Sequence, residues 1–202
     1  MRVVVLAKAP VAGRSKTRLL TRWSPAETAA LAEASLADTL ETVARVDAEH
    51  HLALDGEPGA WLPEGYVVSP QVTGDLGTRI CAALQGSPVP TLLIGMDTPQ
   101  VTVADLRLGL ELLTTHDASF GLATDGGWWA LGLALPATHA GVVRGVPTSR
   151  DDTGSLQLQA IRAAGLSVAV LPTLRDVDLP EDADAVADAI PASRFGRLVA
   201  AL

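Results

Sequence analysis

Val3-Val4-Val5-Leu6 is the stretch of the 202-residue sequence that decides the fold. The run is apolar and mostly β-branched, and no polar residue alternates through it, which is typical of a strand buried on both faces of a parallel sheet. Residues 7–18 follow directly, where Pro10, Gly13 and four basic residues end the pattern and predict a loop. In an α/β sheet, ligands bind in loops of this kind, outside the carboxyl ends of the strands.

Strands and helices alternate through the rest of the chain. Apolar runs predict strands at 51–54, 66–68, 91–96, 118–123, 128–135 and 167–171. Helices are expected at 25–44, 76–84, 103–113, 152–164 and 180–190, two of them opened by the capping boxes at 24–27 and 102–105. This order predicts an α/β fold with a mainly parallel central sheet flanked by helices. No repeat or linker divides the sequence, so we expect residues 1–202 to form a single domain.

Composition excludes several classes of protein. The chain has 15 Lys and Arg against 23 Asp and Glu, a net charge of −8, which disfavours nucleic acid as a partner. Its one cysteine, Cys81, rules out an internal disulfide and a cysteine-based zinc site, and its place in a predicted helix favours a core role. The first apolar stretch is too short for a signal peptide, and no run suits a membrane span. A cytoplasmic protein that does not contact membranes is therefore expected.

The basic residues gather in the first loop. Lys8, Arg14, Lys16 and Arg18 follow a buried strand in a chain that is acidic overall, and clustered Lys and Arg suit phosphate oxygens. The loop lacks the glycines of a Walker A motif, and no G-x-G-x-x-G motif occurs in the chain. The alternative interpretation is a solvated basic loop without a ligand.

Two aspartates follow predicted strands. Asp97 stands at the end of 91–96, where a carboxylate can hold a divalent cation that grips a diphosphate. Alternatively, Asp97 bonds its own backbone in a turn before Pro99. Asp178, the second residue of a D-x-D pattern with Asp176, is a possible second metal ligand. Its alternative role is that of a cap for the helix that begins at Pro180.

Two further segments are candidates. Asp75 and Arg79 open a predicted helix and are placed to meet a base or phosphate, although Asp75 also suits an N-cap. Asp125, followed by Gly126, gives a strong hairpin-turn pattern between two strands. The adjacent Trp128 and Trp129 come next and would point to opposite faces of a strand, so at most one walls a pocket directly.

Together these segments resemble a bacterial family of GT-A-like, nucleotide-diphospho-sugar transferase-type proteins. Some members are labelled as glycosyltransferases linked to arsenosugar biosynthesis, and the family is related to phospholactate guanylyltransferases and molybdenum-cofactor nucleotidyltransferases. The resemblance spans nearly the whole chain and rests on five motifs. They are A-K-A-P-x-x-G-x-x-K-T-R-L at 7–19, G-D-L-G-x-R at 74–79, G-x-D-T-P at 95–99, D-G-G-W-W-x-L-G-L at 125–133 and D-V-D-x-P-E-D at 176–182.

The resemblance implies a Rossmann-like GT-A fold that uses Mg²⁺ or Mn²⁺. It implies Asp97 as the metal-site aspartate, with Asp178 as the second carboxylate and Lys16 beside the phosphates. We assign Lys16, Asp97 and Asp125 as the catalytic residues, with Asp125 positioning or deprotonating an acceptor. The expected nucleotide-binding residues are Ala7, Lys8, Gly13, Lys16, Arg18, Asp75 and Arg79.

Three departures from the family pattern affect these assignments. Leu179 replaces the usual threonine before Pro180 and so removes a helix cap. Trp128 and Trp129 stand where tyrosines are common. Residues 146–149, Val-Pro-Thr-Ser, replace a Trp-Ser-Thr segment, which affects the acceptor side.

The leading hypothesis is a metal-dependent transferase that takes a nucleotide or nucleotide-diphospho-sugar and a small-molecule acceptor. As a GT-A-type glycosyltransferase it would release a nucleoside diphosphate. As a nucleotidyltransferase it would release pyrophosphate from a nucleoside triphosphate, which the cation-rich loop favours. A hypothesis of another class is a non-catalytic nucleotide-binding domain. Base, sugar, acceptor and oligomeric state are left open.

Overall fold

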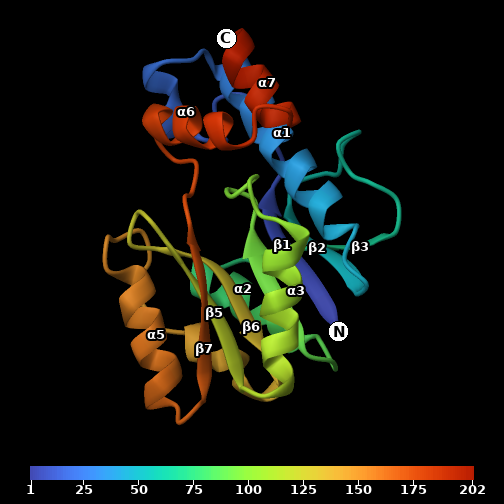
Figure 1. The fold of residues 1–202 in the computed structure, drawn as a ribbon, viewed down its shortest axis with the longest axis vertical. Helices are drawn as coiled ribbons and strands as arrows, with labels where there is room; N and C mark the ends of the chain where they lie inside the picture. Colours follow the sequence, from blue (N-terminus) through green and yellow to red (C-terminus); the bar gives the residue numbers. More distant parts are fainter.

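The computed structural model describes residues 1–202 and contains one seven-stranded sheet (Figure 1). The strand order is β3-β2-β1-β4-β6-β5-β7, and β6 runs antiparallel to both of its neighbours. All other neighbours pair in parallel, so the predicted α/β fold with a mainly parallel sheet is confirmed. The strands are β1 (Arg2–Lys8), β2 (Glu49–Asp55), β3 (Tyr66–Pro70), β4 (Thr91–Gly95), β5 (Ala118–Ala123), β6 (Trp128–Leu133) and β7 (Val168–Leu174).

β1 is an interior strand, and its valines are buried on both faces of the sheet. Val3, Val4 and Val5 are each 0% exposed. Val3 and Val5 belong to a core cluster with residues of α1 (Pro25–Val43) and α3 (Val103–Glu111), whereas Val4 belongs to a second cluster with residues of α2 (Leu76–Gln85). Helices therefore cover both faces of the strand, as the unbroken apolar run predicts.

The predicted helices begin at the residues whose side chains were expected to cap them. The Ser24 hydroxyl accepts the Glu27 N–H at 3.3 Å, and the Glu27 carboxylate accepts the Ser24 N–H at 2.8 Å, so both halves of a capping box open α1. Thr102 and Asp105 open α3 in the same way. The remaining predicted helices are α5 (Thr153–Ala163) and α6 (Pro180–Ala189). Shorter segments are η1 (Thr17–Thr21), η2 (Leu112–Thr114), α4 (Pro136–His139) and η3 (Ala140–Val143).

One helix, α7 (Arg194–Ala201), has no counterpart in the sequence prediction. The Asp38 carboxylate on α1 accepts the backbone N–H of Phe195 at 2.9 Å and of Arg194 at 3.2 Å, so a distant residue binds its first amides. Phe195 packs with Leu19 and Trp23 in a third apolar cluster. In Figure 1, α6 and α7 lie together beside α1 at one end of the molecule.

Strand β7 extends three residues beyond the prediction, to Leu174, and contains Pro172. It is the edge strand, where a residue without an N–H is tolerated because one side of the strand has no partner. The extension matters because it carries the chain to the carboxyl edge of the sheet, directly before Arg175. Among the helices, none is long and apolar enough to cross a membrane.

Candidate active site

The segment after β7 crosses the carboxyl edge of the sheet to reach the end of β4. β5 and β6 separate the two strands in the sheet. The Val177 N–H donates to the Asp97 carbonyl at 2.8 Å, and the Gln100 side-chain amide donates to the Arg175 carbonyl at 2.6 Å. These bonds hold 175–178 beside the residues that follow β4, so two of the predicted ligand-binding loops meet there.

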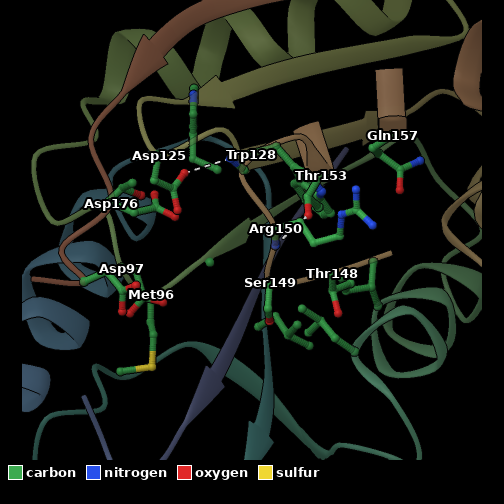
Figure 2. A pocket seen from close by; sticks show the side chains of 18 of the residues that line it. Met96, Asp97, Asp125, Trp128, Thr148, Ser149, Arg150, Thr153, Gln157 and Asp176 are labelled. Atoms are coloured by element: carbon green, nitrogen blue, oxygen red, sulfur yellow. Dashed lines mark hydrogen bonds between the residues drawn. The ribbon is translucent and has the colours of Figure 1, made fainter. Parts of the chain in front are cut away.

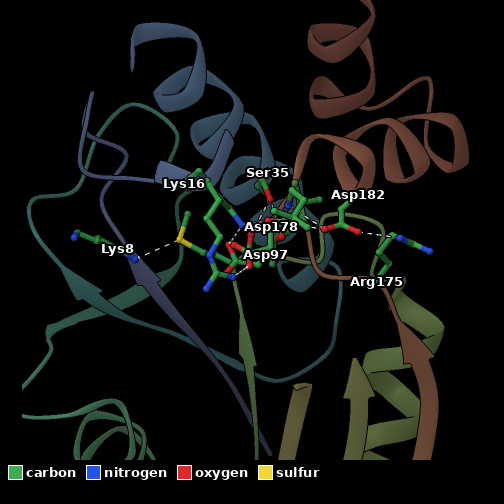
Figure 3. A network of polar contacts seen from close by, with 12 residues as sticks. Lys8, Lys16, Ser35, Asp97, Arg175, Asp178 and Asp182 are labelled. Atoms are coloured by element: carbon green, nitrogen blue, oxygen red, sulfur yellow. Dashed lines mark hydrogen bonds and ion pairs between the residues drawn. The ribbon is translucent and has the colours of Figure 1, made fainter. Parts of the chain in front are cut away.

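The first loop brings two cations to the same place, and Figure 3 shows one of them, Lys16, beside Asp97. Lys16 has a left-handed backbone, with φ 51°, and its side chain is 9% exposed. Its ammonium forms an ion pair with Asp97 and donates to the Val177 carbonyl. Arg18 forms an ion pair with Asp178. The loops after β1, β4 and β7 therefore form one cation–carboxylate junction, made of Lys16, Arg18, Asp97 and Asp178.

The end of β4 is held from both sides. The Met96 sulfur accepts the Lys8 backbone N–H at 3.3 Å, and the Met96 carbonyl accepts the Ser35 hydroxyl at 2.8 Å. Ser35 is fully buried in α1. Asp97 therefore follows a residue that is bonded to β1 through its sulfur and to α1 through its carbonyl (Figure 3).

Asp176 adds a third strand-end carboxyl beside the junction. Burial, together with the negative charges of Asp97 and Asp125, raises the pKa of this carboxyl to about 8. Its Oδ1 is buried and has no hydrogen-bond partner. Asp97, Asp125 and Asp176 line the same cavity (Figure 2). A buried carboxyl with an unpartnered oxygen among other carboxylates is suited to bind a cation.

Two cavities meet at the junction. The smaller, of about 280 Å³, lies against the first loop and is bordered by Lys8, Arg14, Lys16 and Arg18. The larger, of about 600 Å³, extends away from the junction toward α2 and α5. Arg18, Met96, Asp97 and Asp178 border both. The far part of the larger cavity is lined by Ile80, Trp128, Val143, Thr148, Ser149, Arg150 and Gln157 (Figure 2).

Asp125 lies in the turn between β5 and β6, as the Asp-Gly pattern predicts. Its Oδ1 accepts the Gly127 N–H at 2.8 Å. Gly126 has φ 88°, and a Cβ there would lie 1.8 Å from the Asp151 carbonyl oxygen, so the turn requires glycine and packs against the 150–154 loop. The turn therefore fixes Asp125 at the wall of the larger cavity.

The two tryptophans lie on opposite faces of β6, as predicted. Trp129 belongs to the core cluster on the α1 and α3 side, is 1% exposed, and donates its indole N–H to the Pro172 carbonyl at 3.0 Å. Trp128 packs against the cluster on the α2 side, with its ring centroid 5.7 Å from that of Phe120. Both tryptophans nevertheless border the larger cavity, so the expectation that at most one of them walls a pocket is wrong; Trp128 is the half-buried member of the two.

The other expected nucleotide-binding residues are spread along the same edge of the sheet. Asp75 is the N-cap of α2 and accepts the Thr78 N–H at 2.8 Å; hydrogen bonding with the Thr78 side chain and backbone lowers the pKa of its carboxyl. Gly13 is exposed in the first loop with φ 73°. Ala7 ends its buried stretch of β1, and its carbonyl accepts a bond from Gln71. Arg79 lies on α2, and its guanidinium donates to the same Gln71 side chain.

The interpretation of Asp178 as a helix cap is wrong. The N-cap position of α6 is Leu179, and the Asp182 carboxylate accepts the Leu179 N–H at 2.9 Å. Asp178 does not cap α6 and instead forms an ion pair with Arg18. Asp176 lines the same cavity as well, although its position in the sequence alone assigns it no separate role. In the extended segment after β7, residues two apart reach the same region, and this spacing is the signal that points to Asp176.

Comparisons with known proteins agree with this architecture. The family model described as "Uncharacterized protein conserved in bacteria (DUF2064)" matches residues 28–150, more than half of the chain. A 3-phospho-D-glycerate guanylyltransferase from Phenylobacterium zucineum (strain HLK1) is 32% identical over 199 residues, which covers 86% of this chain and 84% of that protein.

Solved structures show the same fold. A candidate nucleotide-diphospho-sugar transferase from Desulfovibrio desulfuricans G20 has a TM-score of 0.89 at 25% identity, covering 98% of this chain and 93% of that one. The 2-C-methyl-D-erythritol 4-phosphate cytidylyltransferase from Thermus thermophilus has a TM-score of 0.57 at 20% identity, covering 99% and 98% of the two chains. The chain belongs to the bacterial DUF2064 family, and its fold and relatives make it a GT-A-like member of the nucleotidyltransferase-type proteins.

Proposed function

We propose that this protein transfers a nucleotidyl group from a nucleoside triphosphate to a small phosphorylated acid and releases pyrophosphate. The observation that carries the proposal is the cation–carboxylate junction between two cavities, one lined by four basic residues and one large enough for an acceptor. The relative that acts as a 3-phospho-D-glycerate guanylyltransferase supports this reaction class. A phosphorylated hydroxy acid is therefore the first acceptor to test.

The transfer exchanges one bond at the α-phosphorus. An acceptor phosphate oxygen attacks this phosphorus, and the bond to the bridging oxygen of the β-phosphate breaks, so that pyrophosphate leaves with the electron pair. Lys16 and Arg18 lie where the triphosphate would enter and would neutralise the charge that grows on the leaving group. Arg150 borders the far part of the larger cavity and would meet the carboxylate of the acceptor.

The strand-end carboxyls fit a divalent cation. The geometry contains no ready-made group of three or more protein ligands. Mg²⁺ often binds through one or two carboxylates and substrate phosphates while keeping several waters, so such a group is not required. The unpartnered Oδ1 of Asp176 and the carboxylates of Asp97 and Asp178, which pair with Lys16 and Arg18, would provide the oxygen ligands. Bound Mg²⁺ or Mn²⁺ would stabilise charge on the phosphates.

Pyrophosphate release tests the proposal. Purified protein is incubated with each nucleoside triphosphate, 3-phosphoglycerate and Mg²⁺ or Mn²⁺, and the products are separated. We expect pyrophosphate and a nucleoside-diphospho adduct, and loss of both in Lys16→Ala and Asp97→Ala. Arg107→Gln, which removes an exposed cation of α3 away from both cavities, is the matched control. Nucleotide binding that is unchanged in Lys16→Ala and Asp97→Ala would refute the site.

Glycosyl transfer is the second candidate function. The relative described as a candidate nucleotide-diphospho-sugar transferase covers nearly the whole chain and favours it. The same incubation with nucleotide-sugars would then yield a nucleoside diphosphate in place of pyrophosphate. Metal-dependent binding without turnover of any donor would support the third hypothesis, a non-catalytic nucleotide-binding domain.

A further inference from the structure

The wall of the larger cavity contains more carboxylates than cations. Six aspartates border it: Asp97, Asp125, Asp151, Asp176, Asp178 and Asp182. The basic residues that border it are Arg18 and Arg150. A molecule bound in this cavity therefore meets a negative electrostatic potential, which attracts a cationic group and repels an anionic one.

Both arginines of the wall are already paired. Arg18 forms an ion pair with Asp178. Arg150 donates from Nε and Nη2 to the two carboxylate oxygens of Asp152, at 2.8 Å and 2.9 Å. Of the guanidinium nitrogens of Arg150, Nη1 is therefore the one left for a ligand. Arg150 can bind an acceptor carboxylate through this nitrogen, but its positive charge is balanced by Asp152.

The six aspartates differ in whether a cation balances them. Three form ion pairs: Asp97 with Lys16, Asp178 with Arg18 and Asp182 with Arg175. The other three, Asp125, Asp151 and Asp176, pair with no cation of the chain. Asp176 lies with Asp97 where a divalent cation is proposed. Asp125 and Asp151 are therefore the carboxylates that remain for the acceptor.

Asp125 and Asp151 are carried on backbone segments that touch each other. A Cβ on Gly126 would lie 1.8 Å from the Asp151 carbonyl oxygen, so the turn after Asp125 packs directly on this residue. The Gly154 N–H donates to the Gly126 carbonyl at 2.7 Å, which attaches the start of α5 to the same turn. Both aspartates are exposed and border the cavity, so both are accessible to a bound molecule.

Gln157 adds a fixed hydrogen-bond acceptor from α5. The residue is 1% exposed, and its amide nitrogen donates to the Val142 carbonyl at 3.1 Å. Because the nitrogen is used there, the amide oxygen is the end left for a ligand, and it has no partner in the chain. Gln157 follows Thr153 by one helical turn, and both border the cavity (Figure 2). Polar side chains buried this deeply normally have their acceptors filled, so a ligand that donates a hydrogen bond suits this position.

We propose that the acceptor of the transfer is a phosphorylated amino acid, whose ammonium group is bound by Asp125, Asp151 and the amide oxygen of Gln157. The inference rests on the proposed nucleotidyl transfer and deepens it by naming the acceptor class. An ammonium group has three donors and no acceptor, which matches two carboxylates and an amide oxygen. The carboxylate of the amino acid would meet Nη1 of Arg150. A hydroxyl group in place of the ammonium would provide one donor and no charge.

O-phosphoserine and 3-phosphoglycerate form a matched pair of acceptors, because they differ only in an ammonium group in place of a hydroxyl. The kcat/KM for pyrophosphate release and the Kd are measured for 3-phosphoglycerate and for both enantiomers of O-phosphoserine. We expect wild type to prefer the better enantiomer of O-phosphoserine about 10- to 100-fold, which corresponds to one hydrogen bond between charged groups. In Asp151→Asn, this preference should fall about 10-fold.

Two further variants separate recognition of the ammonium from a structural effect. Gln157→Met keeps the length of the side chain and removes the oxygen, so it should lower the same preference. Asp188→Asn removes an exposed carboxylate of α6 that borders neither cavity, and it should retain the wild-type preference. If neither compound is turned over, the ratio of the two Kd values is judged by the same criteria.

The inference is overturned if wild type prefers 3-phosphoglycerate or does not distinguish the two compounds. It is also overturned if Asp151→Asn weakens both compounds by the same factor. Pyrophosphate release with 3-phosphoglycerate in these cases would leave the proposed function intact. A wild-type protein that binds no nucleoside triphosphate would instead refute the proposed function.

Discussion

Replacement of Asp176 by asparagine should change how the stability of the protein depends on pH. The carboxyl has a pKa of about 8 in the folded chain, against an ordinary value of 3.8 that applies in the unfolded chain. Between these values the folded state holds a proton that the unfolded state has released. The free energy of unfolding therefore falls as pH rises, by about 1.4 kcal/mol per pH unit, and this loss is complete above the folded pKa.

The size of this effect follows from the pH interval over which the folded state holds the extra proton. Between pH 5 and pH 7, the Asp176 carboxyl should cost wild type about 2–3 kcal/mol of stability. Asp176→Asn cannot ionise, so its stability relative to wild type should improve by that amount over the same interval. Urea unfolding at both pH values in EDTA measures the difference. Asp188→Asn, which neutralises an exposed carboxylate on α6, is the control and should show no such change.

Repeating the stability measurement with a divalent cation tests the role of Asp176 independently. If Mn²⁺ binds the ionised carboxylate, it displaces the proton, so wild type should lose much of its pH dependence in Mn²⁺. Asp176→Asn should respond weakly or not at all. A stability difference between the two proteins that is the same at pH 5 and pH 7 would refute the reasoning, because it would show that Asp176 takes up no proton on folding.

Three further predictions concern the frame around the site. Asp38→Ala should destabilise the protein by about 2 kcal/mol in urea unfolding, because the backbone amides of Arg194 and Phe195 lose their acceptor. A variant as stable as wild type would mean that α7 does not need these two hydrogen bonds. Gly126→Ala should lower both Tm and acceptor turnover, since its Cβ would overlap the Asp151 carbonyl; an unchanged Tm would contradict the close approach. Tyr66, the only tyrosine, is half-buried, and the loss of hydration raises the pKa of its phenol well above 10.0. Ultraviolet titration should show no phenolate until the chain unfolds, and stability should fall as pH rises above about 10, where only the unfolded state ionises.

Local patterns were sufficient for most of the fold. The valine run predicted a strand buried on both faces, and the capping boxes at 24–27 and 102–105 predicted where two helices begin, because each signal lies within a few residues of its effect. α7 was not predicted although Ser193 caps it locally, accepting the Gly196 N–H at 2.9 Å; its attachment to α1 depends on Asp38, more than 150 residues earlier in the chain. The length of β7 depends on its pairing with β5, which no local pattern reveals.

The sequence was sufficient to predict that Lys16 and Asp97 belong to one site, but it was not sufficient to predict the role of Asp176. Loops after buried strands of an α/β sheet converge by topology, so Lys16 and Asp97 could be expected to meet. The burial of Asp176 is a property of the folded chain, since it depends on where residues after β7 pack against Asp97 and Asp125. The role of Leu179 as N-cap was missed because Asp182 supplies the acceptor from within α6.

The bond between Lys16 and the Val177 carbonyl joins residues 161 positions apart, which has a consequence for the timing of assembly. During synthesis from the N-terminus, the first loop emerges long before the segment that completes the junction. Closing so long a loop is entropically unfavourable, and the contacts of α6 and α7 with α1 and η1 offset this only when the last helices have formed. A nascent chain should therefore have a nearly complete sheet but no assembled junction, and nucleotide binding should begin only after release from the ribosome.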